Sequence, residues 1–210
     1  MMKPYEGLIV LGAGGHARSV FDVAVSLGID AICFVDINAQ PGERIGTFPV
    51  VKSWDEDIPR GWFVIPAAGD NLKRKAQFEW AVHKAWPLAT LVAPTATIGY
   101  GSVVGPGAFV AQHSHIGPMA SVGKGCIVNT GASIEHECVI GAFTHVSVNA
   151  VVAGRSHVGE LCFLGANSTV VDGISIVSNV VVGAGGCVPR SIDEPGTYVG
   201  VPARLISKKC

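Results

Sequence analysis

Hydrophobic residues recur at every sixth position through the second half of the chain. A period of six matches neither an α-helix (about 3.6 residues) nor an alternating strand (about 2 residues), so it indicates a repeat architecture. Sets of three hexads form the coils of a parallel β-helix, whose core receives the repeated side chain. An aliphatic residue fills each hexad position: Val92, Ile98, Val104, Val110, Ile116, Val122, Val128, Ile134, Ile140, Val146, Val152, Val158, Leu164, Val170, Ile176, Val182 and Val188.

Two further positions of the hexad carry small residues. The position four residues after the aliphatic residue is expected to face inward as well, and glycine directly after the aliphatic residue is expected to permit the tight corner between flat strands. The small inward residues are Ala96, Ser102, Ala108, Ser114, Ala120, Cys126, Ala132, Cys138, Thr144, Ala150, Ser156, Cys162 and Ser168. The corner glycines are Gly99, Gly105, Gly117, Gly123, Gly141, Gly159, Gly165 and Gly183.

The first part of the chain has a different pattern, in which short apolar runs alternate with amphipathic segments. Alternation of this kind predicts a small α/β domain with a parallel, Rossmann-like sheet. The predicted strands are 8–11, 31–35 and 63–68, and the predicted helices are 16–27 and 72–85. We therefore expect three regions: the α/β domain at 1–88, the β-helix at 89–190 and a C-terminal cap or tail at 191–210.

Composition and charge exclude several classes of protein. The chain has 210 residues and a net charge of −1, so no overall field attracts nucleic acid or an anionic membrane. No apolar run reaches the roughly 18 residues of a membrane span, and no signal peptide is evident, so we expect a cytoplasmic protein. Three of the cysteines, Cys126, Cys138 and Cys162, occupy small inward positions, which favours reduced thiols packed as small hydrophobes.

A glycine-rich turn follows the first predicted strand and begins the first predicted helix. Gly12, Gly14 and Gly15 would let the backbone approach a phosphate at the helix N-terminus. Asp36 ends the next strand, where its carboxylate could accept from a ribose or base, and His16 either caps the helix or reaches a phosphate or sugar. The domain is short for a dinucleotide, so one nucleotide is the favoured ligand; the alternative is a tight turn with nothing bound.

The strongest catalytic candidate is His136, which two glutamates flank on a β-helix that is otherwise poor in charge. Glu137 could fix the imidazole tautomer, as a general base requires. Counting one coil as eighteen residues stacks His136 between Pro118 and Gly154, where the glycine is expected to leave space for a substrate. The alternative is a solvated Glu-His-Glu edge.

A metal site is not expected from the histidine spacing. A zinc site needs three converging ligands, and no two histidines of the repeat region stand one coil apart. Two or more subunits together could still bring His115, His145 and His157 close to one another.

Several segments together resemble the left-handed β-helix acyltransferases. They are the hexads, the runs Ile-Glu-His-Glu-Cys-Val-Ile-Gly at 134–141 and His-Val-Ser-Val at 145–148, and Gly-Val-Pro-Ala at 200–203. The front domain, with Gly-Ala-Gly-Gly-His at 12–16 and Phe-Val-Asp at 34–36, narrows the resemblance to sugar acetyltransferases. That group includes the N-acetyltransferases of nucleotide-linked 4-amino sugars and the sialic acid O-acetyltransferases.

This resemblance implies a left-handed coil and a homotrimer with active sites between subunits. It implies that acetyl-CoA is the co-substrate and that a nucleotide-linked amino sugar, UDP-linked by preference, is bound by residues 1–88. His136 would be the general base, with Glu137 as its partner. The donor would be held by His145, Gly154, Ala166 and Arg204, and the acceptor by Gly12, Gly14, Gly15, His16, Asp36, Gly69, Asp70, Asn71 and Asn129. Asp70 departs from the asparagine usual in relatives, which is expected to alter substrate contacts.

Three alternatives to amino-sugar N-acetylation remain open from the sequence. The nearest is O-acetylation of a sugar hydroxyl, as in sialic acid. A β-helix metallohydratase, which predicts bound zinc and no affinity for CoA, is more distant, because the histidine spacing and the front domain count against it. A structural or ice-binding solenoid would show ladders of threonine on a flat face, which these repeats lack.

Overall fold

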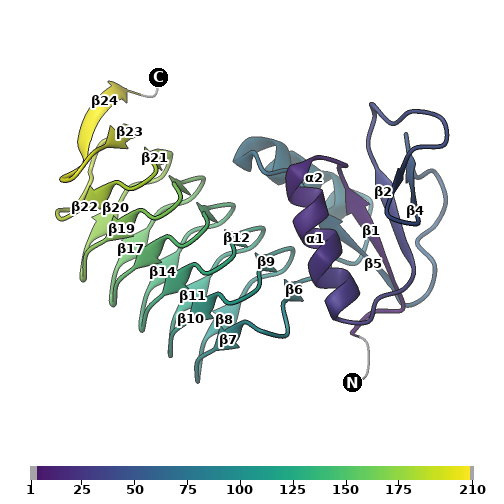
Figure 1. The fold of residues 1–210 in the computed structure, drawn as a ribbon, viewed down its shortest axis with the longest axis horizontal. Coiled ribbons are helices and arrows are strands. Elements are labelled where there is room, and N and C mark those ends of the chain that lie inside the picture. The colour runs from purple at the N-terminus through teal and green to yellow at the C-terminus, as the bar shows by residue number, and fades with distance from the viewer. Residues whose placement is uncertain (1–3, 209–210) are drawn as a thin grey trace.

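The computed structural model describes residues 4–208 and shows an α/β domain followed by a left-handed β-helix (Figure 1). The α/β domain contains a five-stranded sheet in the order β3-β4-β2-β1-β5, whose strands are parallel except for the β3–β4 pair. Its elements are β1 (Gly7–Leu11), α1 (Gly15–Ser26), β2 (Ile32–Val35), β3 (Arg44–Ile45), β4 (Phe48–Val51), β5 (Trp62–Pro66) and α2 (Asn71–His83).

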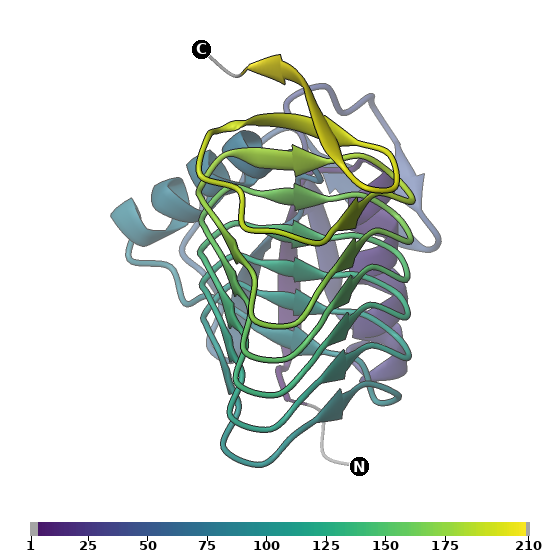
Figure 2. The ribbon, with the colours of Figure 1, turned by 90° about the vertical axis from the view of Figure 1, so that its left-hand side faces the viewer.

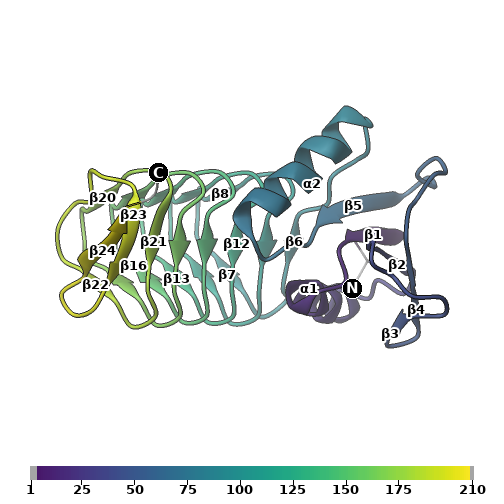
Figure 3. The same ribbon diagram turned by 90° about the horizontal axis from the view of Figure 1, so that it is seen from above.

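The two helices cover opposite faces of this sheet (Figure 3). Leu8 and Val10 of β1 pack in the same core as α1, whereas Ile9 and Leu11 pack with Ala81 of α2. Burial on both faces explains why the strands are continuous apolar runs rather than alternating ones. The predicted helices and parallel sheet are confirmed, but the short strands β3 and β4 were not predicted, because Gly46 and Pro49 interrupt that segment and β3 lies at the sheet edge.

The β-helix consists of very short strands that form three flat sheets around a triangular core (Figure 2). We name each sheet by its first strand. The β6 sheet contains β6 (Leu91–Val92), β9 (Phe109–Val110), β12 (Ile127–Val128), β15 (His145–Val146), β18 (Phe163–Leu164) and β21 (Val180–Val182). The β7 sheet contains β7 (Thr97–Ile98), β10 (His115–Ile116), β13 (Ser133–Ile134), β16 (Val151–Val152), β19 (Thr169–Val170) and β22 (Cys187–Val188). The β8 sheet contains β8 (Val103–Val104), β11 (Ser121–Val122), β14 (Val139–Ile140), β17 (His157–Val158) and β20 (Ser175–Ile176).

The strand register confirms the coil length expected from the hexads. Ile116 pairs with Ile134, and Ile134 pairs with Val152, so equivalent residues stand one coil apart. The aliphatic residues from Val110 to Val188 are buried in one core with the small residues of the second inward position. Ile98 differs, since it lies in the first coil, has no coil beneath it and is 42% exposed.

The glycine that follows the aliphatic residue has a different role from the one expected. The left-handed backbone of each corner falls two residues later, as at Met119 (φ 60°) and Glu137 (φ 58°), and not at these glycines. A Cβ on Gly117 would lie 2.6 Å from the backbone nitrogen of His136 in the next coil. Glycine is therefore required by the close approach of neighbouring coils rather than by the turn itself.

The C-terminal residues extend the β6 sheet at the far end of the β-helix. β23 (Gly196–Val199) pairs in parallel with β21, and β24 (Arg204–Lys208) pairs in antiparallel with β23. Tyr198 packs against the β-helix core, so this hairpin closes the last coil. Within residues 4–208, neither helix has the length and apolar character that crossing a bilayer requires.

Candidate active site

His136 and Glu137 lie at the corner that joins β13 to β14. The Nδ1 atom of His136 is 3.1 Å from Oε2 of Glu137, and the His136 side chain is 43% exposed. Glu137 holds the left-handed position of this corner, which turns its carboxylate back toward the preceding imidazole. Pairing through Nδ1 leaves Nε2 as the nitrogen with which His136 can take a proton.

Gly154 lies one coil above His136, as the coil arithmetic predicts, but the space beside it is not free for a substrate. A Cβ on Gly154 would lie 2.5 Å from Nε2 of His136, so the imidazole itself occupies that space. One coil further on, Oδ1 of Asp172 lies 3.0 Å from the same point, and the Asp172 carboxylate is paired with Arg155. Sequence reasoning missed Asp172 and Arg155, although the eighteen-residue spacing from His136 through Gly154 points to Asp172.

A second pair of histidines lies where the α/β domain meets the β-helix. His16 is the second residue of α1, His145 lies on β15, and their ring centroids are 6.3 Å apart. Phe109 packs edge-on against His16 at 5.0 Å, and Phe163 packs edge-on against His145 at 5.1 Å. Asn129 places its Nδ2 atom 3.2 Å from Nε2 of His145. The structure therefore brings together three of the predicted ligand-binding residues, from both parts of the chain.

Burial keeps both of these histidines uncharged. Desolvation lowers the pKa of His16 to about 3, helped by His145 and by the Arg74 guanidinium. Desolvation and Arg74 also lower the pKa of His145 to about 4, against a smaller opposing effect of the Gly69 backbone. Among the described residues, Nε2 of His16 and Nδ1 of His145 are buried without a hydrogen-bond partner, so each ring keeps one unsatisfied polar atom.

Asn71, predicted to bind substrate, joins the two parts of the chain. Its Nδ2 donates to the Cys162 carbonyl at 2.9 Å, and its Oδ1 accepts from Arg74 at 2.7 Å. The neighbouring Asp70 caps α2, because its Oδ1 accepts from the backbone nitrogen of Lys73 at 2.9 Å. Both side chains thus have structural partners, and the backbone of Gly69 lies beside His16.

The glycine-rich turn borders a cavity at the carboxyl ends of β1 and β2. Ala13, Gly14, Asp36, Asn38, Ala39 and Glu43 line it, and it measures about 190 Å³. The Asp36 carboxylate accepts from the backbone nitrogens of Ala13 and Asn38, at 3.0 Å each, so it also holds the turn together. Nothing lies within 4 Å of the Cβ positions of Gly14 and Gly15, which leaves the α1 N-terminus open to a ligand.

A second cavity, of about 300 Å³, adjoins the histidine pair. The first residues of α2 form one wall and the outer face of the β6 sheet forms the floor; the lining residues are Gly69, Asp70, Asn71, Leu72, Leu161, Phe163 and Val181. The cavity and the histidine pair share two neighbours, because Phe163 packs against His145 and Gly69 lies beside His16.

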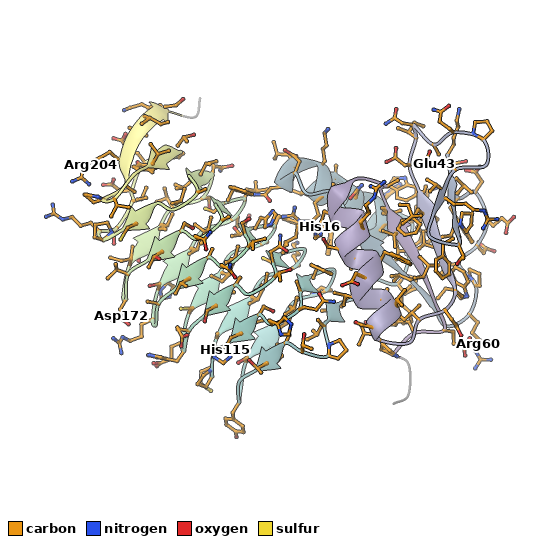
Figure 4. The ribbon with its side chains drawn as sticks, in the orientation of Figure 1. His16, Glu43, Arg60, His115, Asp172 and Arg204 are labelled. Atoms are coloured by element: carbon orange, nitrogen blue, oxygen red, sulfur yellow. The ribbon has the colours of Figure 1, made fainter. Side chains whose placement is uncertain are left out.

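Other predicted donor-binding residues lie apart from the histidine pair. Ala166 is in the corner after β18, where its carbonyl accepts from Gly185 at 2.8 Å, and Arg204 is exposed on the terminal hairpin. Figure 4 shows Arg204 at the opposite end of the β-helix from His16, and Asp172 on an edge turned away from the α/β domain. His136 lies at the corner between the β7 and β8 sheets, opposite the β6 sheet that carries His145, so a single chain does not present both clusters to one small ligand.

Comparison with known proteins gives a consistent result for both parts of the chain. Residues 7–81 match the model of the PglD N-terminal domain, and residues 157–188 match the hexapeptide repeat of succinyl-transferase. The acetyltransferase domain of PglB from Neisseria gonorrhoeae FA1090, in complex with acetyl coenzyme A, is 29% identical with a TM-score of 0.92, over 96% of this chain and 100% of that one.

A third comparison decides the family. PerB from Caulobacter crescentus, in complex with CoA and GDP-perosamine, is 30% identical with a TM-score of 0.87, over 96% of this chain and 97% of that one. The chain belongs to the hexapeptide-repeat family of nucleotide-sugar N-acetyltransferases. It is therefore an acetyltransferase, which confirms the enzyme class expected from the sequence. WeeI from Acinetobacter baumannii AYE, at 20% identity and a TM-score of 0.83, shows the same fold.

Residues 4–208 contain no group of three or more histidine, cysteine, aspartate or glutamate side chains that could hold a metal ion.

Proposed function

We propose that this protein transfers the acetyl group of acetyl-CoA to the 4-amino group of a nucleotide-linked amino sugar, with UDP as the preferred nucleotide. The family and the ligands of PglB and PerB support this donor and this class of acceptor. The observation that carries the proposal is the His136–Glu137 pair on a half-exposed corner. The preference for UDP rests on the sequence resemblance and is the first detail to test.

In the proposed mechanism His136 is the general base. A sugar amine is a nucleophile only when unprotonated, so Nε2 of His136 takes a proton from the amine or from the tetrahedral adduct that it forms. A bond forms between the amine nitrogen and the acetyl carbon, the thioester C–S bond breaks, and the proton leaves with the CoA thiolate. Glu137 holds the ring through Nδ1 and stabilises the charged imidazole during the step.

The donor is proposed to lie across Asn129 and His145, with its acetyl group at the histidine pair. The neutral rings of His16 and His145 are proposed to donate hydrogen bonds to the acetyl oxygen without placing a further positive charge beside the reacting amine. His16 is also proposed to face the sugar. Gly154 keeps His136 in place, and Ala166 and Arg204 are proposed to meet the rest of CoA along the β-helix. Arg204 is exposed, as a residue that meets a phosphate must be.

The acceptor is proposed to bind in the cavity beside Asp36. Its diphosphate would lie at the open N-terminus of α1, next to Gly14 and Gly15, because a helix N-terminus attracts negative charge. Gly12 adopts φ 110°, which shapes the turn that exposes these backbone groups. Gly69, with Asp70 and Asn71, borders the second cavity, through which the sugar would approach His145.

We further propose a homotrimer in which two chains build each site. His136 lies on the same corner as Asp172, which Figure 4 shows on the edge turned away from the α/β domain, so a neighbouring chain would bring His136 to the bound sugar. Since acetyl-CoA and nucleotide sugars are cytoplasmic metabolites, we place the reaction in the cytoplasm.

A thiol-release assay with acetyl-CoA tests this proposal. The acceptors are 4-amino sugars linked to UDP, GDP or dTDP, together with free sialic acid and the corresponding 4-hydroxy nucleotide sugars as matched controls. We expect release with a nucleotide 4-amino sugar, fastest with UDP, and a product that resists hydroxylamine because it is an amide. A hydroxylamine-sensitive product formed from sialic acid would instead establish O-acetylation. If none of the acceptors on the panel supported CoA release, the proposed substrate class would be refuted.

A further inference from the structure

Arg74 is a buried cation that has no acidic partner. It is 1% exposed and lies in the first turn of α2. All its hydrogen bonds in the described part of the chain go to neutral oxygen atoms: the carbonyls of Ala68, Gly69, Gly125 and Phe143, and Oδ1 of Asn71. Burying a charge without an opposite charge is costly, so these hydrogen bonds have to offset the loss of hydration of the guanidinium.

These hydrogen bonds join three segments that are far apart in sequence. Nε donates to Gly125 at 2.7 Å and Nη2 to Phe143 at 2.7 Å, both at β-helix corners, while Nη1 donates to Ala68 at 3.0 Å after β5. One planar group therefore fixes α2 and the loop before it against two successive coils. The same loop contains Gly69, which lies beside His16 and His145.

The guanidinium also acts on the histidine pair through its charge. Burial lowers the pKa of Arg74 only to about 10, so it remains protonated at neutral pH. Its charge disfavours protonation of both His16 and His145. The ionisable groups that face this cluster are Cys126, a buried thiol whose pKa burial raises to about 12, and Asp70, whose carboxylate caps α2.

We propose that Arg74 is a positioning residue of the acetyl-transfer site, which fixes the places of His16 and His145 and sets a permanent positive charge behind their rings. The proposal rests on the proposed function for its kinetic consequence. The uncharged rings then donate hydrogen bonds to the acetyl oxygen, and the nearby charge favours the oxyanion that develops there. A purely structural role would account for the hydrogen bonds but not for the effect of the charge on the two rings.

The decisive experiment follows the titration of His16 and His145 by NMR in the absence of substrate. Signals are assigned with single histidine variants and compared in the wild type, Arg74→Gln, Arg74→Lys and Lys73→Gln. Lys73→Gln is the matched control, because it removes a positive charge from the exposed residue that directly precedes Arg74 in α2. We expect Arg74→Gln to raise both midpoints by about one pH unit, the order of effect of a nearby unit charge in a protein interior. Arg74→Lys and the control are expected to keep the low midpoints.

Turnover provides the second measurement. Because an ammonium cannot reach all five oxygen atoms, we expect Arg74→Lys to lower kcat about 10-fold or more, with acetyl-CoA affinity changed much less. Unchanged midpoints in folded Arg74→Gln would overturn the proposal. Should Arg74→Gln not fold, wild-type kcat in Arg74→Lys would overturn it. An enzyme that acetylates none of the proposed acceptors leaves the titration result intact, so failure of the proposed function is distinguishable from failure of this inference.

Discussion

The two histidine clusters are made in opposite ways. His136 and Glu137 are consecutive residues on one corner of the β-helix, half-exposed, and held by a geometry that the hexads repeat along the chain. His16 and His145 come from different parts of the chain, are enclosed by aromatic rings, and are positioned by the junction between those parts. Repetition thus supplies the exposed group that we propose carries the proton, whereas packing between unlike units supplies the buried groups that are held neutral.

The largest expected effect is on the exposed cluster. We expect His136→Ala to lower kcat by about 10²–10⁴-fold, the usual contribution of a general base, with little change in acetyl-CoA affinity. His157→Ala is the matched control, since it removes another exposed β-helix histidine and is expected to keep wild-type kcat. Steady-state kinetics and calorimetric CoA titration check both variants. Equal kcat in the two variants would remove His136 from the mechanism.

A smaller change at the same corner tests whether the placement of the ring matters. A Cβ in Gly154→Ala would meet the imidazole of His136 at 2.5 Å, so the ring must move. We expect kcat to fall about 10-fold or more while the melting temperature changes little, because a corner side chain can shift without disturbing the core. Wild-type kcat would show that the observed ring position is not the catalytic one.

Burial of His16 and His145 is expected to lower the stability of the folded protein at mildly acidic pH. The pKa values of His16 and His145 in the folded state, about 3 and about 4, are lower than the ordinary value of 6.5. Between these values and 6.5 the unfolded chain therefore binds protons at two histidines that stay unprotonated in the folded chain. Stability that is fully present above pH 6.5 is therefore lost progressively as the pH falls toward these folded values.

Melting temperatures between pH 7 and pH 5 measure this loss before most carboxylates titrate. We expect His145→Gln to flatten the decline, whereas His83→Gln, at an exposed position on α2, keeps the wild-type slope. Parallel curves for all three proteins would contradict the uncharged state of the buried pair.

This contrast also explains how much could be predicted from the sequence. The coil length, the core of the β-helix and the pairing of His136 with Glu137 depend on local periodicity, so they could be predicted residue by residue. Arg74 could not, because the carbonyls that bind it come from corners brought near only by folding. The contact of Asn71 was missed for the same reason, since its partner, the Cys162 carbonyl, is distant in sequence. The cap by Asp70 is local, but it leaves no periodic signal.

The most direct test of the account mixes two inactive variants. His136→Ala and His145→Ala are each expected to lack activity, and in the proposed homotrimer co-expression allows mixed trimers to form. If each site takes His136 from one chain and His145 from its neighbour, every mixed trimer has one intact site, and random mixing restores about a quarter of wild-type turnover. No recovery in mixed trimers, shown to form by differential tagging, would mean that one chain supplies both clusters and would contradict the shared site.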